Sequence, residues 1–263
     1  MISFPSRGWA PDISLRSLRV WQRDGDVFLQ SWFTEIGPIF LEPLLVLAIM
    51  GMGLGFYVGP IEGQPYLKFI APGIIGAWSM FGAVFEATFG SYMRMEVRRL
   101  YDAMIATPLT VEDVIAGEIL WAATRTFLSA AVILLVITLF GLVDSPLALF
   151  VLPLSFVAGL TFASIAMLFT ALARSISTFN HFFTLFITPM FFFGGVFFPL
   201  DKLPALAKGI AWVFPLTAYV DITRKLVGGH PDLEMAWAFL YMLALIALCF
   251  PAAVLAMRKR LIR

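Results

Sequence analysis

The sequence RMEVRRLYDAMIATPLTVEDVIAGE, from Arg94 to Glu118, is the longest polar interval in an otherwise apolar chain. Proline has no N–H to donate within a helix, so Thr107-Pro108 predicts a corner in the middle of this interval. Thr110 and Asp113 have the spacing of a capping box and predict that a new helix starts there. We therefore expect a short helix over Tyr92–Ala106, a corner, and a second helix that enters the next apolar segment.

The first of these helices carries an apolar stripe. Met93, Val97, Leu100 and Met104 follow one another at helical spacing and would share one face, with the charged residues on the other faces. Such a helix can lie along a membrane surface or against a partner protein. The alternative is a solvated loop between two membrane spans.

The composition indicates an all-α polytopic membrane protein. The 263 residues are 60% hydrophobic and 13% charged, and the mean hydropathy is +0.91. Soluble domains carry about 25% charged residues. The single cysteine, Cys249, excludes a disulfide framework. The first 30 residues contain no apolar core of a signal peptide, so we expect no cleavage there.

No catalytic, cofactor or metal site is predicted on this chain. None of the five lysines is followed by Ser or Thr, so the phosphate-binding lysine motif of ATPases is absent. The two histidines do not form an HExxH motif, and no nucleophile and base stand at a recognisable spacing. A net charge of +1 gives no indication of nucleic-acid binding.

Hydropathy predicts six membrane spans behind an N-terminal segment. Residues 1–32 alternate apolar and arginine positions, as in an amphipathic helix lying in the membrane interface. A span takes about 20 apolar residues, and residues 33–263 form the transmembrane domain. The candidate spans are Ile36–Tyr57, Phe69–Tyr92, Ile119–Leu142, Leu147–Ala173, Phe179–Phe198 and Ala236–Met257.

The distribution of basic residues predicts the orientation. With the N-terminus inside, twelve of the eighteen Lys and Arg residues fall on inner segments and five on outer ones, while Arg125 lies within a span. Because cytoplasmic loops carry the excess of positive charge, both termini and the Arg94–Glu118 interval are expected in the cytoplasm.

The fifth span is short and is followed by an irregular apolar segment. Phe179–Phe193 would make a helix of about 22 Å at 1.5 Å per residue, less than the hydrocarbon core of about 30 Å. Val196–Gly229 is too apolar for an ordinary loop and too rich in Gly and Pro for a span. It predicts a re-entrant pair of short helices on the outer side, between spans five and six, because irregular backbone at that depth must be shielded by protein.

Three ionisable residues lie within the predicted spans. Glu42, Glu86 and Arg125 each fall about 9 Å inside the cytoplasmic boundary at 1.5 Å per residue. Intramembrane charges usually pair or mark function, so we expect one cluster in which Arg125 bridges the two carboxylates. The alternatives are that Arg125 extends to the headgroups, or that the carboxylates relay protons.

The first span also carries glycines at positions 51, 55 and 59. Small residues at this spacing permit close approach of another helix. The neighbour is either a helix of the same bundle or a second subunit.

The second half of the chain resembles a known family. Gly194-Gly195, Pro199-Leu200, Leu203-Pro204 and Pro215-Leu216, with Arg224 nine residues beyond Pro215, look like the C-terminal signature of type 2 ABC-exporter permeases. The TPLTVEDVIAGE sequence is similar to that family's stretch before the third span, and the resemblance covers nearly the whole chain after the N-terminal segment. Ala218 departs from the pattern, which usually has a polar or aromatic residue there. Within the family, the permeases of nodulation lipooligosaccharide and polysaccharide or drug exporters look most similar.

The resemblance implies partners and a location. It implies a homodimer in the inner membrane of a bacterial cell, bound to two ATPase subunits that carry ATP and magnesium. Tyr92–Ala106 would be the coupling helix seated in the ATPase, and the N-terminal helix would rest on the ATPase and the inner leaflet. The expected coupling residues are Arg98, Arg99, Tyr101, Asp102, Thr107 and Pro108.

Two function classes follow from these observations. The first is the permease of an ATP-driven exporter for an amphipathic substrate, such as a lipid-linked glycan, a lipooligosaccharide or a hydrophobic drug. The second is an ion-coupled secondary transporter that uses Glu42 and Glu86. Five phenylalanines could line a substrate path or could simply pack or face lipid: Phe191, Phe192, Phe193, Phe197 and Phe198.

Overall fold

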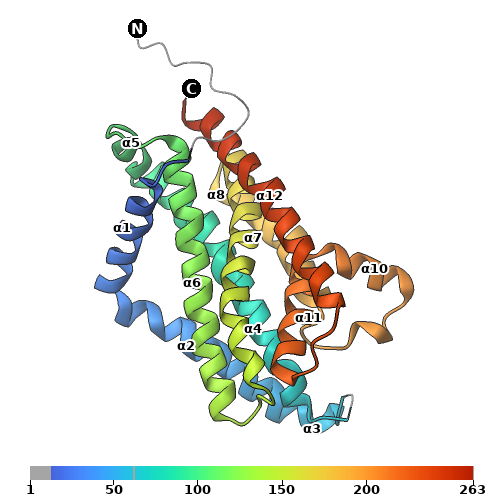
Figure 1. The fold of residues 1–263 in the computed structure, drawn as a ribbon. Helices are drawn as coiled ribbons and strands as arrows, with labels where there is room; N and C mark the ends of the chain where they lie inside the picture. The colour runs from blue at the N-terminus through green and yellow to red at the C-terminus, as the bar shows by residue number, and fades with distance from the viewer. Residues whose placement is uncertain (1–12, 62, 263) are drawn as a thin grey trace.

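The computed structural model describes residues 13–61 and 63–262, and every regular element in these ranges is a helix (Figure 1). The predicted all-α fold is therefore confirmed. Residues 1–12 of the predicted N-terminal segment lie outside the described residues.

Six helical stretches of the described chain are long and apolar enough to cross a membrane, as the hydropathy predicted. Several of them combine an α-helix with a wider π-helical or a tighter 3₁₀ segment. The first consists of α2 (Trp32–Ala48), a π segment (Ile49–Leu54) and α3 (Gly55–Val58), and the second of α4 (Tyr66–Phe85) with π segments Glu86–Gly90 and Met93–Val97. The third span is α6 (Val111–Leu139), and the fourth consists of a 3₁₀ turn (Pro146–Phe150) and α7 (Val151–Leu172). The fifth consists of α8 (Ile176–Phe182), a π segment (Phe183–Ile187) and α9 (Thr188–Phe193). The sixth is α12 (Glu234–Leu261).

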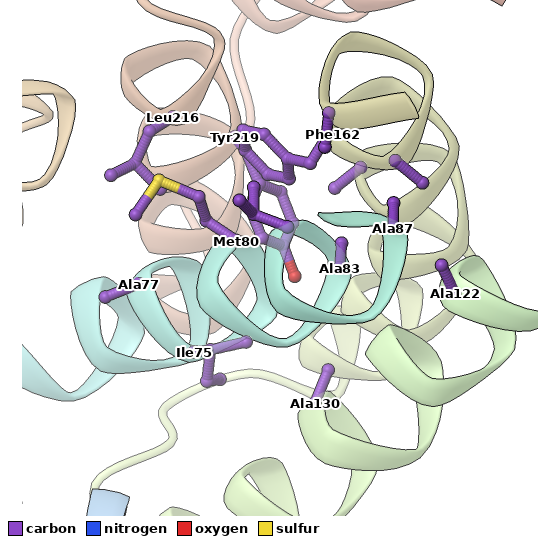
Figure 2. Packing of buried hydrophobic residues seen from close by; sticks show 14 of the residues in the cluster. Ile75, Ala77, Met80, Ala83, Ala87, Ala122, Ala130, Phe162, Leu216 and Tyr219 are labelled. Carbon is purple, nitrogen blue, oxygen red and sulfur yellow. The ribbon is translucent and has the colours of Figure 1, made fainter. Parts of the chain in front are cut away.

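The second span is the centre of the bundle. It is 72% buried, whereas the first is 11% buried and the fifth and sixth are 22% buried each. Figure 2 shows its side chains Ile75, Met80 and Ala83 among residues of the neighbouring helices. The three less buried spans therefore leave apolar faces to lipid or to another subunit.

Helix α1 (Ser17–Gln30) precedes the first span and packs along α6. Val20 is buried on its inner face, and Leu15, just before the helix, is exposed. A Cβ atom at Gly117 of α6 would lie 2.6 Å from the Val20 Cβ and 2.7 Å from the Ser17 carbonyl oxygen. Only glycine at position 117 therefore allows the two helices to cross so closely.

A bent helix pair stands between the fifth and sixth spans, as predicted. After α9 ends at Phe193, a 3₁₀ turn (Leu200–Lys202) leads to α10 (Ala205–Val213) and α11 (Pro215–Gly228), which meet at 93°. Helix α11 returns into the bundle, where Tyr219 is fully buried. Its phenol shares hydrogen bonds with Ser155, at 2.7 Å, and Ser79, at 3.3 Å. Tyr219 thus brings a polar aromatic group next to Ala218, the position that departs from the family pattern.

The predicted helix over Tyr92–Ala106 is wrong in its bounds. The second span continues to Val97, and the chain then turns sharply, because Arg99 adopts a left-handed conformation with φ 51°. Only the six residues Leu100–Ile105 form the separate helix α5. The apolar stripe misled because its first half lies on the span and its second half on α5.

The two local signals after α5 are confirmed. The chain turns at Thr107-Pro108, and α6 begins at Val111. The Asp113 N–H donates to Thr110 Oγ1 and the Thr110 N–H donates to Asp113 Oδ2, both at 3.2 Å. The capping box therefore forms as predicted.

One glycine of the small-residue ridge is used inside the chain. A Cβ at Gly51 would lie 2.1 Å from Leu67 Cδ1 at the start of α4, so this position packs within the bundle. Gly59 has φ 72° and ends α3.

Candidate functional site

The corner between the second and third spans is an exposed polar surface. We call residues 98–108 the corner segment. Four charged or polar side chains predicted to couple to a partner are exposed, namely those of Arg98, Arg99, Asp102 and Thr107, and so is Pro108. Arg99 Nη1 lies 3.6 Å from Asp102 Oδ2. The segment lies at the end of the bundle where the chain's C-terminus also lies (Figure 1).

Tyr101 does not belong to this exposed surface. Its side chain is fully buried beneath α5, so the prediction that it is exposed for a partner is wrong. Burial raises the pKa of its phenol well above the ordinary value, and nearby Glu118 adds to that shift. The ring therefore anchors α5 to the bundle as a neutral group.

A buried charge network lies under the corner segment. Arg94 Nη2 is 2.7 Å from Glu86 Oε1 and 2.5 Å from Glu118 Oε2, while Arg94 Nε is 2.9 Å from Glu118 Oε1. Arg125 Nη1 lies 2.6 Å from the other oxygen of Glu86. The side chain of Glu118 is fully buried and also accepts from Ser91 Oγ at 2.8 Å.

The network differs from the predicted one in its bridging residues. Glu86 and Arg125 pair as expected, but the arginine that bridges two carboxylates is Arg94, and the second carboxylate is Glu118. The hydropathy pattern places both residues in the cytoplasmic loop, because it predicts that the second span ends at Tyr92 and the third begins at Ile119. Their helices in fact run deeper into the polar interval.

Glu42 occupies a different place. Its side chain is exposed and lines an open cavity of about 410 Å³ together with Arg125, Phe85 and Phe191. It thus lies next to the network, on the wall of a cavity that is otherwise mainly aromatic and aliphatic.

Helix α1 places a further buried carboxylate close enough to the network to interact with its charges. Asp24 is 5% exposed, and its Oδ1 lies 2.7 Å from Arg23 Nη1. Burial, with a smaller contribution from the charge of Glu118, raises the pKa of Asp24 to about 7 against the opposing effects of Arg94 and Arg23. The buried face of α1 is therefore sensitive to protonation near neutral pH.

Further contacts join α1, the corner segment and α6. The Ser14 N–H and hydroxyl donate to Asp113 Oδ1 at 2.7 and 2.9 Å, and Arg16 Nη1 donates to the Pro108 carbonyl at 2.5 Å. Trp21 Nε1 donates to Thr124 Oγ1 at 2.8 Å. These bonds fix the exposed corner to two helices at once.

The C-terminal end of α12 is joined to the same region. Arg260 Nη2 lies 2.8 Å from Glu96 Oε1, at the end of the second span, and Arg258 Nη1 lies 3.3 Å from Glu112 Oε1 at the start of α6. These two ion pairs therefore join α12 to the end of the second span and to the start of the third.

The predicted phenylalanine path is partly assembled. Phe191, Phe192 and Phe197 are in mutual ring contact, with centroids 4.9–6.2 Å apart. Phe192 and Phe193 are exposed, and Phe198 is half-buried.

An aromatic row on the second span extends this group. Phe81 contacts Phe191 at 5.2 Å, Phe85 contacts Phe183 at 4.7 Å, and Phe89 contacts Phe179 at 5.2 Å. Sequence reasoning missed this row, although the spacing of positions 81, 85 and 89 places three rings on one helix face.

Comparison with known proteins identifies the family. A family model described as ABC-2 type transporter matches residues 18–227. Nodulation protein J of Rhizobium leguminosarum bv. trifolii is 34% identical over 253 residues, which cover 96% of this chain and 97% of that protein. Nodulation protein J of Rhizobium meliloti (strain 1021) is 32% identical over 229 residues, covering 87% and 85%. The inner membrane transport permease YadH of Escherichia coli (strain K12) is 22% identical over 239 residues, covering 86% and 88%.

The family match spans the corner segment, the charge network and the bent helix pair, and the two nodulation proteins align along most of their own length. The resemblance seen in the sequence is confirmed, and the chain belongs to the ABC-2 type transporter family of membrane permeases.

Proposed function

We propose that this chain is the permease subunit of an ATP-driven exporter and works as a homodimer with two ATPase subunits. ATP and magnesium would bind on those partner chains. The complex would lie in the inner membrane of a bacterial cell, with both termini in the cytoplasm and the α10–α11 pair dipping in from the outer side. Family membership and the name of the permease relative support this assignment.

One observation supports the proposed coupling role of the corner segment. Its exposed residues Arg98, Arg99 and Asp102 follow shortly after Arg94, the centre of the network that links the second span to α6. A short polar helix held this way can pass the closure of an ATPase dimer to the spans as a rigid-body motion. ATP binding would supply the bias between two states of the bundle.

The substrate we propose is amphipathic, in the class of lipid-linked glycans, lipooligosaccharides and hydrophobic drugs. The aromatic row that contains Phe85 borders the cavity lined by Glu42 and Arg125. Aromatic faces suit both acyl chains and sugar rings, and the charged residues offer hydrogen bonds to a polar headgroup.

The competing ion-coupled mechanism needs a carboxylate that can exchange its ion. Both oxygens of Glu86 are held by arginines, one by Arg94 and one by Arg125, which argues against that role for Glu86. Glu42, on the cavity wall, is the remaining candidate.

Reconstituted vesicles distinguish the two mechanisms. The chain and its ATPase would be placed in proteoliposomes, and uptake of a fluorescent lipid-linked glycan into inside-out vesicles would be followed with ATP or with an imposed proton or sodium gradient. We expect uptake to require ATP and to survive collapse of the gradients. Uptake that persists with a hydrolysis-deficient ATPase and stops with the gradient would reject the proposal.

A further inference from the structure

A second cavity, of about 580 Å³, opens between the C-terminal ends of α7 and α12. Ligand pockets typically enclose about 300–1,000 Å³. Where the two helices face this cavity its walls are apolar and include Leu172, Leu255 and Ala256. Its remaining lining includes three basic side chains, those of Arg174, Lys259 and Arg260, and no acidic residue of the described chain lines it.

Arg260 makes the cavity more favourable for an anion by occupying carbonyl oxygens at the end of α7. Helix α7 ends here, and the last carbonyl oxygens of a helix carry partial negative charge that would repel an anion. Arg260 Nη1 donates to the carbonyls of Thr170 and Ala173, at 2.6 Å each, while its Nη2 is paired with Glu96. The repulsive carbonyls are thereby occupied, and the charge of Arg260 is itself balanced.

The two other cations set the character of the opening. Arg174 and Lys259 are exposed, and no carboxylate of the described residues lies within ion-pair distance of either. They face the same cavity from two different helix ends. The opening therefore has two positive charges above an apolar groove.

An amphipathic anion matches both parts of this surface. A free phosphate ion would leave the apolar walls uncovered, whereas a phospholipid would cover them with an acyl chain. The sixth span is only 22% buried, so much of α12 is accessible to lipid or to another subunit. Basic pockets between transmembrane helices on the cytoplasmic side bind acidic lipid headgroups.

We propose that the α7–α12 groove binds an anionic phospholipid of the inner leaflet, with the phosphate between Arg174 and Lys259 and an acyl chain along α12. This site is separate from the aromatic cavity proposed for the transported substrate. Because Arg260 ties the same region to Glu96 at the end of the second span, the bound lipid would brace the junction below the corner segment.

Native mass spectrometry of the purified full chain tests the site. The protein would be titrated in detergent with phosphatidylglycerol and, separately, with zwitterionic phosphatidylcholine. We expect preferential retention of phosphatidylglycerol. Replacing both cations, Arg174→Gln with Lys259→Gln, should weaken its binding about twenty-fivefold, since each Lys or Arg near an anionic surface contributes about fivefold.

Two comparisons separate a specific site from general charge loss or misfolding. Arg174→Lys keeps the charge and should bind within about twofold of the unchanged protein. Arg19→Gln with Lys202→Gln removes two cations that do not line this cavity and should leave binding unchanged. Equal losses in both double variants, or equal retention of the two lipids, would overturn the proposal. So would displacement of the lipid by millimolar inorganic phosphate, which would make the site one for free anions.

Discussion

Removing the Arg94 side chain should destabilise the protein more than removing any other single cation of the network. Its guanidinium contacts two carboxylates. Arg94→Leu would leave the fully buried Glu118 side chain with the Ser91 hydroxyl as its one donor among the described residues. Breaking a buried ion pair from one side costs about 3–5 kcal/mol, because the remaining charge is uncompensated. Glu86 keeps Arg125 as its partner and adds less to the loss.

The comparison with Arg125 tests this reasoning. Arg125→Leu leaves Glu86 with Arg94, so we expect a smaller loss of about 2 kcal/mol, the contribution of one hydrogen bond to a charged group. Replacing both partners, Arg94→Leu with Glu118→Leu, should recover most of the Arg94 loss, because an apolar pair of similar volume needs no compensation.

Equilibrium unfolding of the purified chain in mixed micelles provides the assay, with the free energy of unfolding extrapolated from a denaturant titration. Arg19→Leu, on the exposed face of α1, is the matched control and should change stability by no more than about 0.5 kcal/mol. Two results would refute the account of the network. One is an Arg94→Leu loss no larger than that of the control. The other is a double variant whose loss equals the sum of its single losses.

Three further predictions address α1 and the helix pair. Because the pKa of Asp24 is raised from 3.8 to about 7, the stability that its protonation contributes is fully present below pH 3.8 and is lost as the pH rises through 7. Asp24→Asn should flatten that decline and raise the unfolding temperature at pH 8, and an unchanged pH profile would contradict this prediction. Gly117→Ala should lower the free energy of unfolding by about 1–3 kcal/mol, because the new methyl group pushes α1 away from α6. Gly82→Ala is the control and should not be destabilising, because its new Cβ would meet nothing within 4 Å. Equal effects of the two variants would show that the close crossing is unimportant. Single cysteines at Asp201 and His230 should both react with an impermeant thiol reagent added outside intact cells. Labelling of either position only from the cytoplasmic side would contradict the re-entrant arrangement.

The features predicted correctly from the sequence are those with local chemical causes. The capping box depends on two side chains three residues apart, and the turn at Thr107-Pro108 depends on a missing N–H. The six spans follow from hydropathy summed over long windows, and the bent helix pair follows from Gly and Pro punctuation between apolar residues. None of these requires knowledge of distant neighbours.

The features missed depend on the folded arrangement. Arg99 adopts a left-handed conformation that is more typical of glycine, so nothing in its type marks the end of the second span. Arg94 pairs with Glu118 because both helices extend into the polar interval, beyond the ends that hydropathy predicts. The prediction for Tyr101 is wrong because the apolar stripe crosses the turn at Arg99, so its residues do not share one continuous helix.

The coupling role of the corner segment is the central claim, and substrate-stimulated ATP hydrolysis tests it most directly. The measurement compares two double variants. The corner variant carries Arg98→Ala and Asp102→Ala, and the matched variant carries Asp201→Ala and Lys202→Ala at the opposite end of the bundle. All four side chains are exposed, so folding and membrane insertion should be nearly unaffected. We predict that the corner variant retains less ATPase on pull-down, or hydrolyses ATP without stimulation by substrate, while the matched variant behaves as the unchanged protein. Normal ATPase retention together with normal substrate stimulation in the corner variant would contradict the claim and make this segment an ordinary solvated turn.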